Sequence, residues 1–276
     1  MAGVTITPTA APVARNLRIN QVGWRAARWL LVIAAALAWE GLARSGRVTS
    51  FMLPPLSAVL ERIWMDAVSG ELFPNLGLTL YRSLAGFLIA AVGGVLLGTL
   101  ITRSRVARWF FDPIISVGFP MPKIAFLPII VLWFGFYDSS KMFMIVLDAI
   151  FPVVTATVSG ILGVERELFW SARSMGANDR QLLWEIALPM ALPRILTGLQ
   201  VAQPIALIVC VISEMTTGGV GLGGAMLNAS RFADSEGVFA GILIIAFAGY
   251  ALIKIMAVIR RRLLRWHQEA LAPSTV

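Results

Sequence analysis

Long apolar runs constrain the fold of this chain more than any other feature of its sequence. A helix needs about 20 mostly apolar residues to cross the hydrocarbon core of a bilayer. Six runs approach or exceed that length, at about residues 26–43, 76–101, 110–136, 142–162, 192–212 and 238–259. Hydrophobic residues make up 58% of the chain and its mean hydropathy is +0.80, values that exclude an ordinary soluble domain. The sequence therefore predicts an all-α polytopic membrane protein with about six transmembrane helices.

The first apolar run has features of a signal peptide as well as those of a membrane helix. Arg25 and Arg28 precede it, and Ala36-Leu37-Ala38 is similar to a cleavage site. Its apolar character continues beyond the usual length of the apolar region of a signal peptide. We therefore interpret this run as an uncleaved first membrane helix.

Basic residues are divided unevenly between the segments that connect these runs. With a cytoplasmic N-terminus, fifteen basic residues lie on the inner side and five on the outer side. The inner ones are Arg15, Arg18, Arg25, Arg28, Arg103, Arg105, Arg108, Arg166, Arg173, Arg180, Arg194, Arg260, Arg261, Arg262 and Arg265, and the outer ones are Arg44, Arg47, Arg62, Lys141 and Arg231. Cytoplasmic loops carry an excess of Lys and Arg, so we expect both termini in the cytoplasm. The net charge of +8 then reflects membrane orientation and requires no nucleic-acid partner.

The chain is expected to have three parts. Residues 1–20 are rich in Thr, Pro and Ala and predict a disordered cytoplasmic N-terminus. Residues 21–266 form the transmembrane domain, and residues 267–276 form a C-terminal tail.

The longest polar interruption between two apolar blocks runs from Glu165 to Pro193. Residues 167–175 contain neither Pro nor Gly and predict a short helix. Gly176 then permits a sharp turn, because a residue without a Cβ atom tolerates a positive φ. The charge distribution places this helix–turn–helix elbow in the cytoplasm, between the fourth and fifth membrane helices.

A second short helix is expected after this turn. Asn178 or Asp179 can cap it, and Gln181 lies at a spacing close to that of a capping box. Pro189 is expected to end it. Its apolar stripe consists of Leu182, Leu183 and Ile186.

The elbow resembles the EAA signature of bacterial ABC importer permeases. That signature is Glu-Ala-Ala, three residues, Gly, nine residues, Ile, one residue and Leu-Pro. Here Trp170-Ser171-Ala172 replaces Glu-Ala-Ala with two letters changed, whereas Gly176, Ile186 and Leu188-Pro189 fit in register. The resemblance implies a coupling helix that docks into a cleft on a cytoplasmic ATPase subunit; the spacing alone also suits an ordinary amphipathic loop. The implied coupling residues are Glu167, Ser171, Ala172, Gly176, Ala177, Arg180, Leu183, Ile186, Leu188 and Pro189.

A wider stretch, from about Leu53 to Trp266, resembles the permeases of the nitrate/sulfonate/taurine importer group. The matching stretches are LPPLSAVLERIW, LTLYRSLAGFLIA, PKIAFLPIIVLWFGF and ARSMGANDRQLLWEIALP. The resemblance implies the permease subunit of an ATP-driven importer in a bacterial cytoplasmic (inner) membrane, with a small, anionic solute such as a sulfonate, taurine or nitrate. It also implies a second copy of this chain, two ATPase subunits that bind ATP and Mg²⁺, and a periplasmic or lipid-anchored substrate-binding protein. This chain is expected to bind membrane lipid and to hold no cofactor or metal itself.

Close helix contacts and an irregular helix are expected within the membrane domain. Gly94 and Gly98 form a G-x-x-x-G pattern, which lets helices approach closely. Prolines interrupt the third run, and broken membrane helices persist only where protein or a water-filled cavity satisfies their free backbone groups. These features favour a homodimer around a central path. The prolines are Pro113, Pro120, Pro122 and Pro128.

Four polar or charged residues inside the predicted helices are candidates for the translocation path: Lys123, Asp148, Gln203 and Glu214. A charge at membrane depth is costly and usually faces a cavity or a partner. Asp148 would line the path or make a structural ion pair, and Lys123 would attract an anion or extend to the interface. Gln203 would line the path or bond a neighbouring helix, and Glu214 would belong to an outer gate. Arg82 and Glu40, near helix ends, are interpreted as interfacial.

Other function classes lack the residues they need. A single cysteine, Cys210, and a single histidine, His267, provide no metal cluster and no Cys–His or His-pair catalysis. No G-x-x-x-x-G-K-[ST] motif occurs, so ATP must be bound elsewhere. The glycine run 218–224 imitates a dinucleotide fingerprint, but no strand precedes it, and we expect a flexible outer loop or a re-entrant segment. The alternatives are a membrane-embedded enzyme, which would lack G-x-S-x-G and H-E-x-x-H, and a membrane anchor or scaffold subunit.

Overall fold

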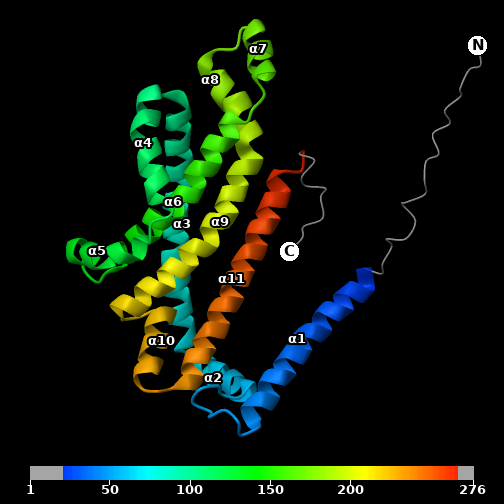
Figure 1. Cartoon of the computed structure of the whole chain (residues 1–276), viewed down its shortest axis with the longest axis vertical. Coiled ribbons are helices and arrows are strands. Elements are labelled where there is room, and N and C mark those ends of the chain that lie inside the picture. The colour runs from blue at the N-terminus through cyan, green and yellow to red at the C-terminus, as the bar shows by residue number, and fades with distance from the viewer. Residues whose placement is uncertain (1–20, 267–276) are drawn as a thin grey trace, which may run out of the picture. The chain divides into compact units, whose positions relative to one another are not determined.

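The computed structural model describes residues 21–266, and every regular element in that range is helical (Figure 1). The expected disordered N-terminus at 1–20 and the C-terminal tail at 267–276 lie outside the described residues. In chain order the helices are α1 (Gln21–Arg44), α2 (Leu56–Val68), α3 (Leu72–Arg103), α4 (Arg105–Gly118), the 3₁₀-helix η1 (Lys123–Phe126), α5 (Leu127–Phe134), α6 (Asp138–Leu162), α7 (Arg166–Ser174), α8 (Asp179–Gln181), the π-helix η2 (Leu182–Ala187), α9 (Leu188–Thr217), α10 (Leu222–Arg231) and α11 (Ser235–Leu263).

Four helical segments in the described range are long and apolar enough to cross a membrane. They are Leu72–Arg103, Asp138–Leu162, Asp179–Thr217 and Ser235–Leu263. The bent pair Arg105–Gly118 and Lys123–Phe134 would supply a fifth span. The all-α membrane fold is therefore confirmed, whereas the expected count of six spans is not, because α1 is not among these segments.

The chain divides into two units, residues 1–59 and 60–276. In the first unit, Glu40 near the end of α1 accepts hydrogen bonds from Arg44 Nε at 2.6 Å and from the Ser57 hydroxyl at 2.8 Å. The Trp39 indole donates to the Pro54 carbonyl at 3.0 Å. These bonds hold the segment after α1 against the end of that helix.

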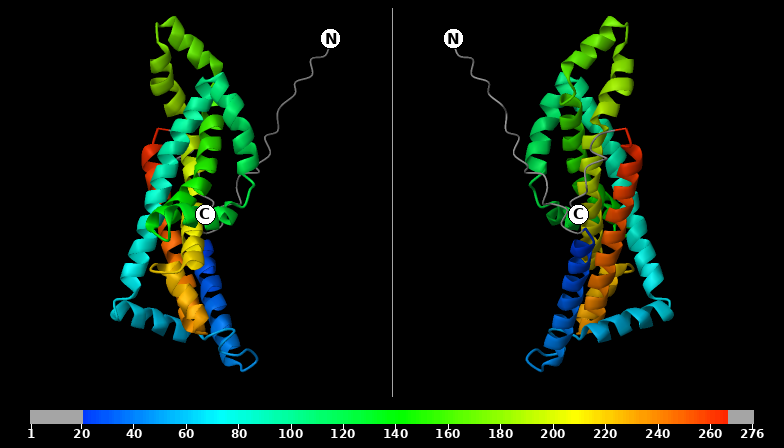
Figure 2. Two further views of the ribbon diagram at one scale, coloured as in Figure 1. Left: turned by 90° about the vertical axis from the view of Figure 1, so that its left-hand side faces the viewer. Right: turned by 90° about the vertical axis from the view of Figure 1, so that its right-hand side faces the viewer.

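In the second unit, α3, α6 and α9 pack along one another and enclose the apolar core (Figure 2). Small residues bring α3 and α6 together: a Cβ atom on Gly94 would lie 2.7 Å from Val153 Cβ, and one on Gly98 would lie 2.7 Å from Thr157 Cβ. The G-x-x-x-G pattern thus serves a contact within the chain. It therefore gives no support to the homodimer that the pattern favours on sequence grounds.

The proline-rich third run is broken, as its composition predicts. The helix α4 and the segment formed by η1 and α5 are bent by 98° relative to each other. Pro113 lies inside α4, and Pro128 lies in the first turn of α5, where its missing N–H has no helical partner to lose. The third run is therefore two short helices and not one straight span.

The expected end of the second elbow helix at Pro189 is wrong. The segment from Asp179 to Thr217 is one continuous helical span of 39 residues. The π-helix η2 lies directly before Pro189, which occupies the first turn of α9. A π turn shifts the hydrogen-bond register, so the missing N–H and the ring of Pro189 are accommodated without ending the helix.

Candidate functional site

The elbow has the turn and the cap that the sequence predicts. Gly176 has φ = +89°, and a Cβ atom there would meet no atom within 4 Å. Asn178 accepts from the Gln181 backbone N–H at 2.9 Å, and the Gln181 side chain accepts from the Asn178 N–H at 2.9 Å. This reciprocal capping box fixes the start of α8 directly after the turn.

Gly176→Val is expected to destabilise the elbow by about 1–2 kcal/mol, because a β-branched residue resists a positive φ. The open space around Gly176 means that no steric clash adds to this cost. Gly176→Asn is the matched control, because Asn adopts such backbone angles more readily. Limited proteolysis at the elbow measures the difference; equal cleavage of both variants and the parent would contradict it.

The elbow exposes a set of large apolar side chains that the sequence did not single out. Trp170 is 63% exposed, Met175 is 80% exposed and Trp184 is 61% exposed. Leu182, by contrast, is 6% exposed, so this part of the predicted stripe packs inside the chain. We call Trp170, Met175 and Trp184 the elbow patch. Trp170 lies inside α7, Met175 directly follows α7 and Trp184 lies on η2, so the periodicity of a single helix does not reveal the patch.

The other residues named for the elbow occupy different depths. Ala172 is buried, and the half-buried ones are Ala177, Leu183, Ile186, Leu188 and Pro189. Glu167, Ser171, Gly176 and Arg180 are exposed. The structure therefore gathers the predicted coupling residues at one end of the second unit (Figure 1), but their coupling role stays a prediction.

Lys123 and Asp148 form an ion pair between η1 and α6. Lys123 Nζ lies 2.9 Å from Asp148 Oδ1, donates to the Phe119 carbonyl at 3.2 Å and lies 4.6 Å from the Phe151 ring centre. Lys123 is only 7% exposed, so the interpretation that its ammonium extends to the interface is wrong. The pair provides the structural partner that Asp148 needs, while a role of either residue in the path stays a prediction.

Gln203, on α9, is buried, and neither its amide oxygen nor its amide nitrogen has a hydrogen-bond partner among the described residues. Leaving both ends of a buried amide unpaired is costly. The expected bond to a neighbouring helix is therefore absent from the described part of the chain.

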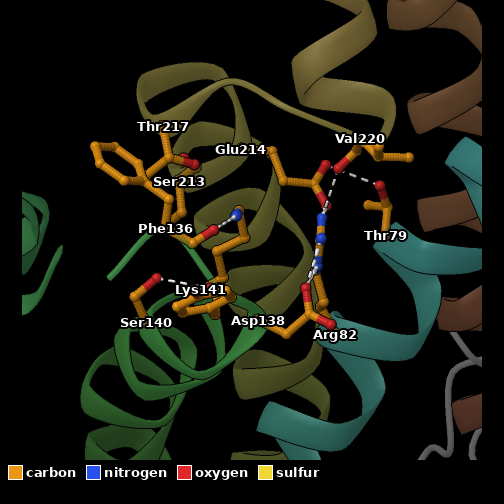
Figure 3. Close-up of polar contacts among 12 residues, drawn as sticks. Thr79, Arg82, Phe136, Asp138, Ser140, Lys141, Ser213, Glu214, Thr217 and Val220 are labelled. Atoms are coloured by element: carbon orange, nitrogen blue, oxygen red, sulfur yellow. Dashed lines mark hydrogen bonds and ion pairs between the residues drawn. The ribbon is translucent and has the colours of Figure 1, made fainter. Parts of the chain in front are cut away.

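Glu214 is the centre of a buried polar cluster (Figure 3). Its side chain has no exposed surface and accepts from Arg82 Nη1 at 2.7 Å, from the Thr79 hydroxyl at 2.8 Å and from the Gly223 N–H at 3.0 Å. Arg82 also binds Asp138, with Nη2 2.6 Å from Oδ1. The cluster joins α3, α6, α9 and the start of α10.

The sequence-based interpretation of Arg82 as an interfacial residue is wrong. Its side chain is 5% exposed and lies between the carboxylates of Asp138 and Glu214. Sequence reasoning missed Arg82, Thr79 and Asp138 as members of a site. The available signal was the presence of opposite charges inside separate apolar helices, Arg82 in the second predicted span and Glu214 at the end of the fifth.

The glycine run after α9 closes over this carboxylate and is not a loose loop. Only residues 218–221 lie between α9 and α10. Gly221 has φ = +130°, and a Cβ atom there would lie 2.5 Å from the Glu214 carboxylate. The Gly221 N–H donates to Asn75 Oδ1 at 2.9 Å. Glycine is thus needed for close backbone approach to Glu214 and not for a dinucleotide.

A cavity of about 400 Å³ lies beyond the cluster, among α2, α3, α10 and α11. Arg62 on its wall lies 2.9 Å from Asp66 and 2.6 Å from Asp234. The hydrogen bond to Asp66 raises the pKa of Arg62 above its ordinary value, so this cation stays charged. Within residues 21–266, no group of three or more potential ligands could hold a metal ion.

Comparisons with known proteins agree on one kind of protein. The profile of the family described as "Binding-protein-dependent transport system inner membrane component" matches residues 90–265. A permease protein named for aliphatic sulfonate transport, SsuC of Bacillus subtilis (strain 168), is 32% identical and covers 97% of each chain. The taurine transport system permease protein TauC of Escherichia coli (strain K12) is 33% identical over 84% of this chain and 86% of its own length.

A solved structure is similar in fold. A chain of the MetNI methionine ABC transporter in an inward-facing conformation matches with a TM-score of 0.53, covering 69% of this chain and 98% of its own. The identity is 17%, so this likeness concerns the fold alone.

Proposed function

Because this chain belongs to the family of binding-protein-dependent transport system inner membrane components, we propose that it forms the membrane path for a small anion of the sulfonate class. It is the permease subunit of an ABC importer and not itself an enzyme. The observation that carries the substrate class is that two relatives, which cover 97% and 84% of this chain, are named for aliphatic sulfonates and for taurine. Both solutes bear a sulfonate group.

The elbow is the docking element for the ATPase in this proposal. The elbow patch of Trp170, Met175 and Trp184 supports it, because three large exposed apolar side chains within one short polar elbow offer an apolar surface to a protein partner. The proposed importer contains two copies of this permease and two ATPase subunits, which bind ATP and Mg²⁺. A substrate-binding protein delivers the anion on the opposite side of the membrane, and the elbow and both termini lie in the cytoplasm.

Cells that lack other sulfonate importers and express this chain with its ATPase and binding protein should accumulate labelled taurine or ethanesulfonate. Accumulation should stop when the ATPase is inactivated by substitution of its phosphate-loop lysine, because this chain has no phosphate loop of its own. Filter uptake assays measure the result. Accumulation that continues with an inactive ATPase would refute the importer assignment, and failure to carry either sulfonate would refute the substrate class.

A further inference from the structure

The cluster around Glu214 buries two cations close together. Arg82 is 5% exposed and Lys141 is 2% exposed. Lys141 donates to the Phe136 carbonyl at 3.1 Å, and no ion pair joins it to a carboxylate within residues 21–266. It nevertheless lies within electrostatic range of Arg82, Asp138 and Glu214. An ammonium group has three donors, so most of the hydrogen-bonding capacity of Lys141 is unused by the described residues.

The two anions of the cluster differ sharply in exposure. Glu214 is fully buried and both of its oxygens are occupied, by Arg82 on one and by Thr79 and Gly223 on the other. The Asp138 side chain is 43% exposed and binds Arg82 through Oδ1 alone. Two buried cations therefore face one fully buried anion, and the remaining charge is balanced by Asp138, a carboxylate that the described residues leave partly uncovered.

The exposed carboxylate also lies at a depth that suits a path. Asp138 opens α6 directly after the turn that follows α5. Figure 1 shows the elbow at one end of the second unit and the connection between α10 and α11 at the other. The turn before α6 lies between these two ends. Figure 3 shows Asp138 reaching the guanidinium edge of Arg82 that faces away from Glu214.

We propose that Arg82 and Lys141 form an oxyanion-binding site on the translocation path, which Asp138 fills in this conformation and which a sulfonate occupies when Asp138 withdraws. The proposal rests on the proposed function and deepens it, because it assigns residues to the recognition of the anion. The Nε–Nη2 edge of Arg82, which now holds Asp138 Oδ1, offers two parallel N–H donors to an oxyanion. Lys141 adds donors for another oxygen. Ser213 directly precedes Glu214, and its buried hydroxyl has no hydrogen-bond partner among the described residues.

Glu214 and Asp138 have different roles in the proposed site: Glu214 orients Arg82, and Asp138 competes with a free anion for it. In this structure Glu214 binds Nη1 of Arg82, which orients the guanidinium and leaves its Nε–Nη2 edge to Asp138. A tethered carboxylate competes with a free anion at a high effective concentration. Asp138 would thus prevent the path from trapping small anions when no substrate is being delivered.

The test uses the assembled permease–ATPase complex in lipid nanodiscs and the probe methanesulfonate. Cys210 is the single cysteine of this chain and is fully buried beside Glu214, with its Sγ 3.7 Å from Oε1. Its modification by a maleimide on heating, quantified by mass spectrometry of the Cys210 peptide, therefore reports the opening of this cluster. Asp138→Asn removes the competing charge while an amide oxygen can still accept from Arg82.

In the Asp138→Asn complex, saturating methanesulfonate is expected to raise the temperature of half-modification by on the order of 5 °C. The neutral isostere dimethyl sulfone should not raise it. The parent complex should shift by about 1 °C or less, because Asp138 occupies the site, and Asp138→Asn combined with Lys141→Met should lose the shift. No shift in Asp138→Asn, an equal shift in the parent, or an equal shift with the sulfone would each overturn the site.

Lys141→Met alone provides a second test if the Asp138→Asn complex cannot be recovered. This change leaves Arg82, Asp138 and Glu214 paired, so near-normal abundance is expected, while uptake of the sulfonate that the parent carries should fall at least about tenfold. Lys254→Met is the matched control, because Lys254 is an exposed lysine on α11 outside the cluster. Normal uptake by Lys141→Met would refute the site, whereas absence of uptake by the parent would refute the proposed function instead.

Discussion

Glu214→Ala is expected to lower the amount of folded protein in the membrane severely, because it destabilises the fold. The substitution leaves Arg82 buried beside a neutral residue and withdraws an acceptor from Thr79 and the Gly223 N–H. Breaking a buried ion pair by removing one partner costs about 3–5 kcal/mol, which is comparable to the whole stability of many domains. Asp138 cannot compensate from its own side, because it already binds the opposite edge of the guanidinium.

Membrane abundance and the thermal stability of detergent-solubilised protein measure this effect. Glu61→Ala is the matched control, because Glu61 is exposed on α2, and it should change stability by less than about 0.5 kcal/mol. Glu214→Ala combined with Arg82→Met should recover part of the loss, since the cation that has lost its buried partner is then removed as well. A double variant less stable than Glu214→Ala would contradict the ion-pair account.

Features that depend on a few neighbouring residues could be predicted from the sequence. Gly176 turns the chain and Asn178 caps the next helix because backbone angle and capping are settled within four residues. The end at Pro189 could not be predicted in the same way, because the tolerance for this proline depends on the π turn before it. Sequence rules for proline assume an α-helical register.

Pairings across the fold were beyond sequence reasoning. Arg82 and Glu214 are 132 positions apart, and each taken alone suits a helix end. Lys123 and Asp148 were both identified as costly charges, but their mutual contact depends on the 98° bend between α4 and the segment containing η1. The glycine run indicated only that side chains are excluded there. The reason is that the Glu214 carboxylate lies against Gly221, a contact that depends on how α9 and α10 pack together.

The elbow patch leads to the second large effect. Met175→Glu and Trp184→Glu place carboxylates where the present side chains are 80% and 61% exposed, so neither change should disturb the fold of this chain. A carboxylate buried against an apolar partner surface costs at least about 2 kcal/mol. That cost corresponds to a more than tenfold weaker association. Both variants should therefore reach the membrane at near-normal levels while losing the ATPase.

Co-purification of the ATPase and sulfonate uptake, normalised to the amount of permease in the same membranes, measure this loss. Phe232→Glu is the matched control, because Phe232 is 85% exposed at the end of α10, far along the chain from the elbow, and it should retain the ATPase. An ordinary amphipathic loop would tolerate all three changes alike. Undiminished ATPase recovery and uptake in Met175→Glu and Trp184→Glu would therefore show that the elbow patch is not the docking surface, even though the chain belongs to the permease family.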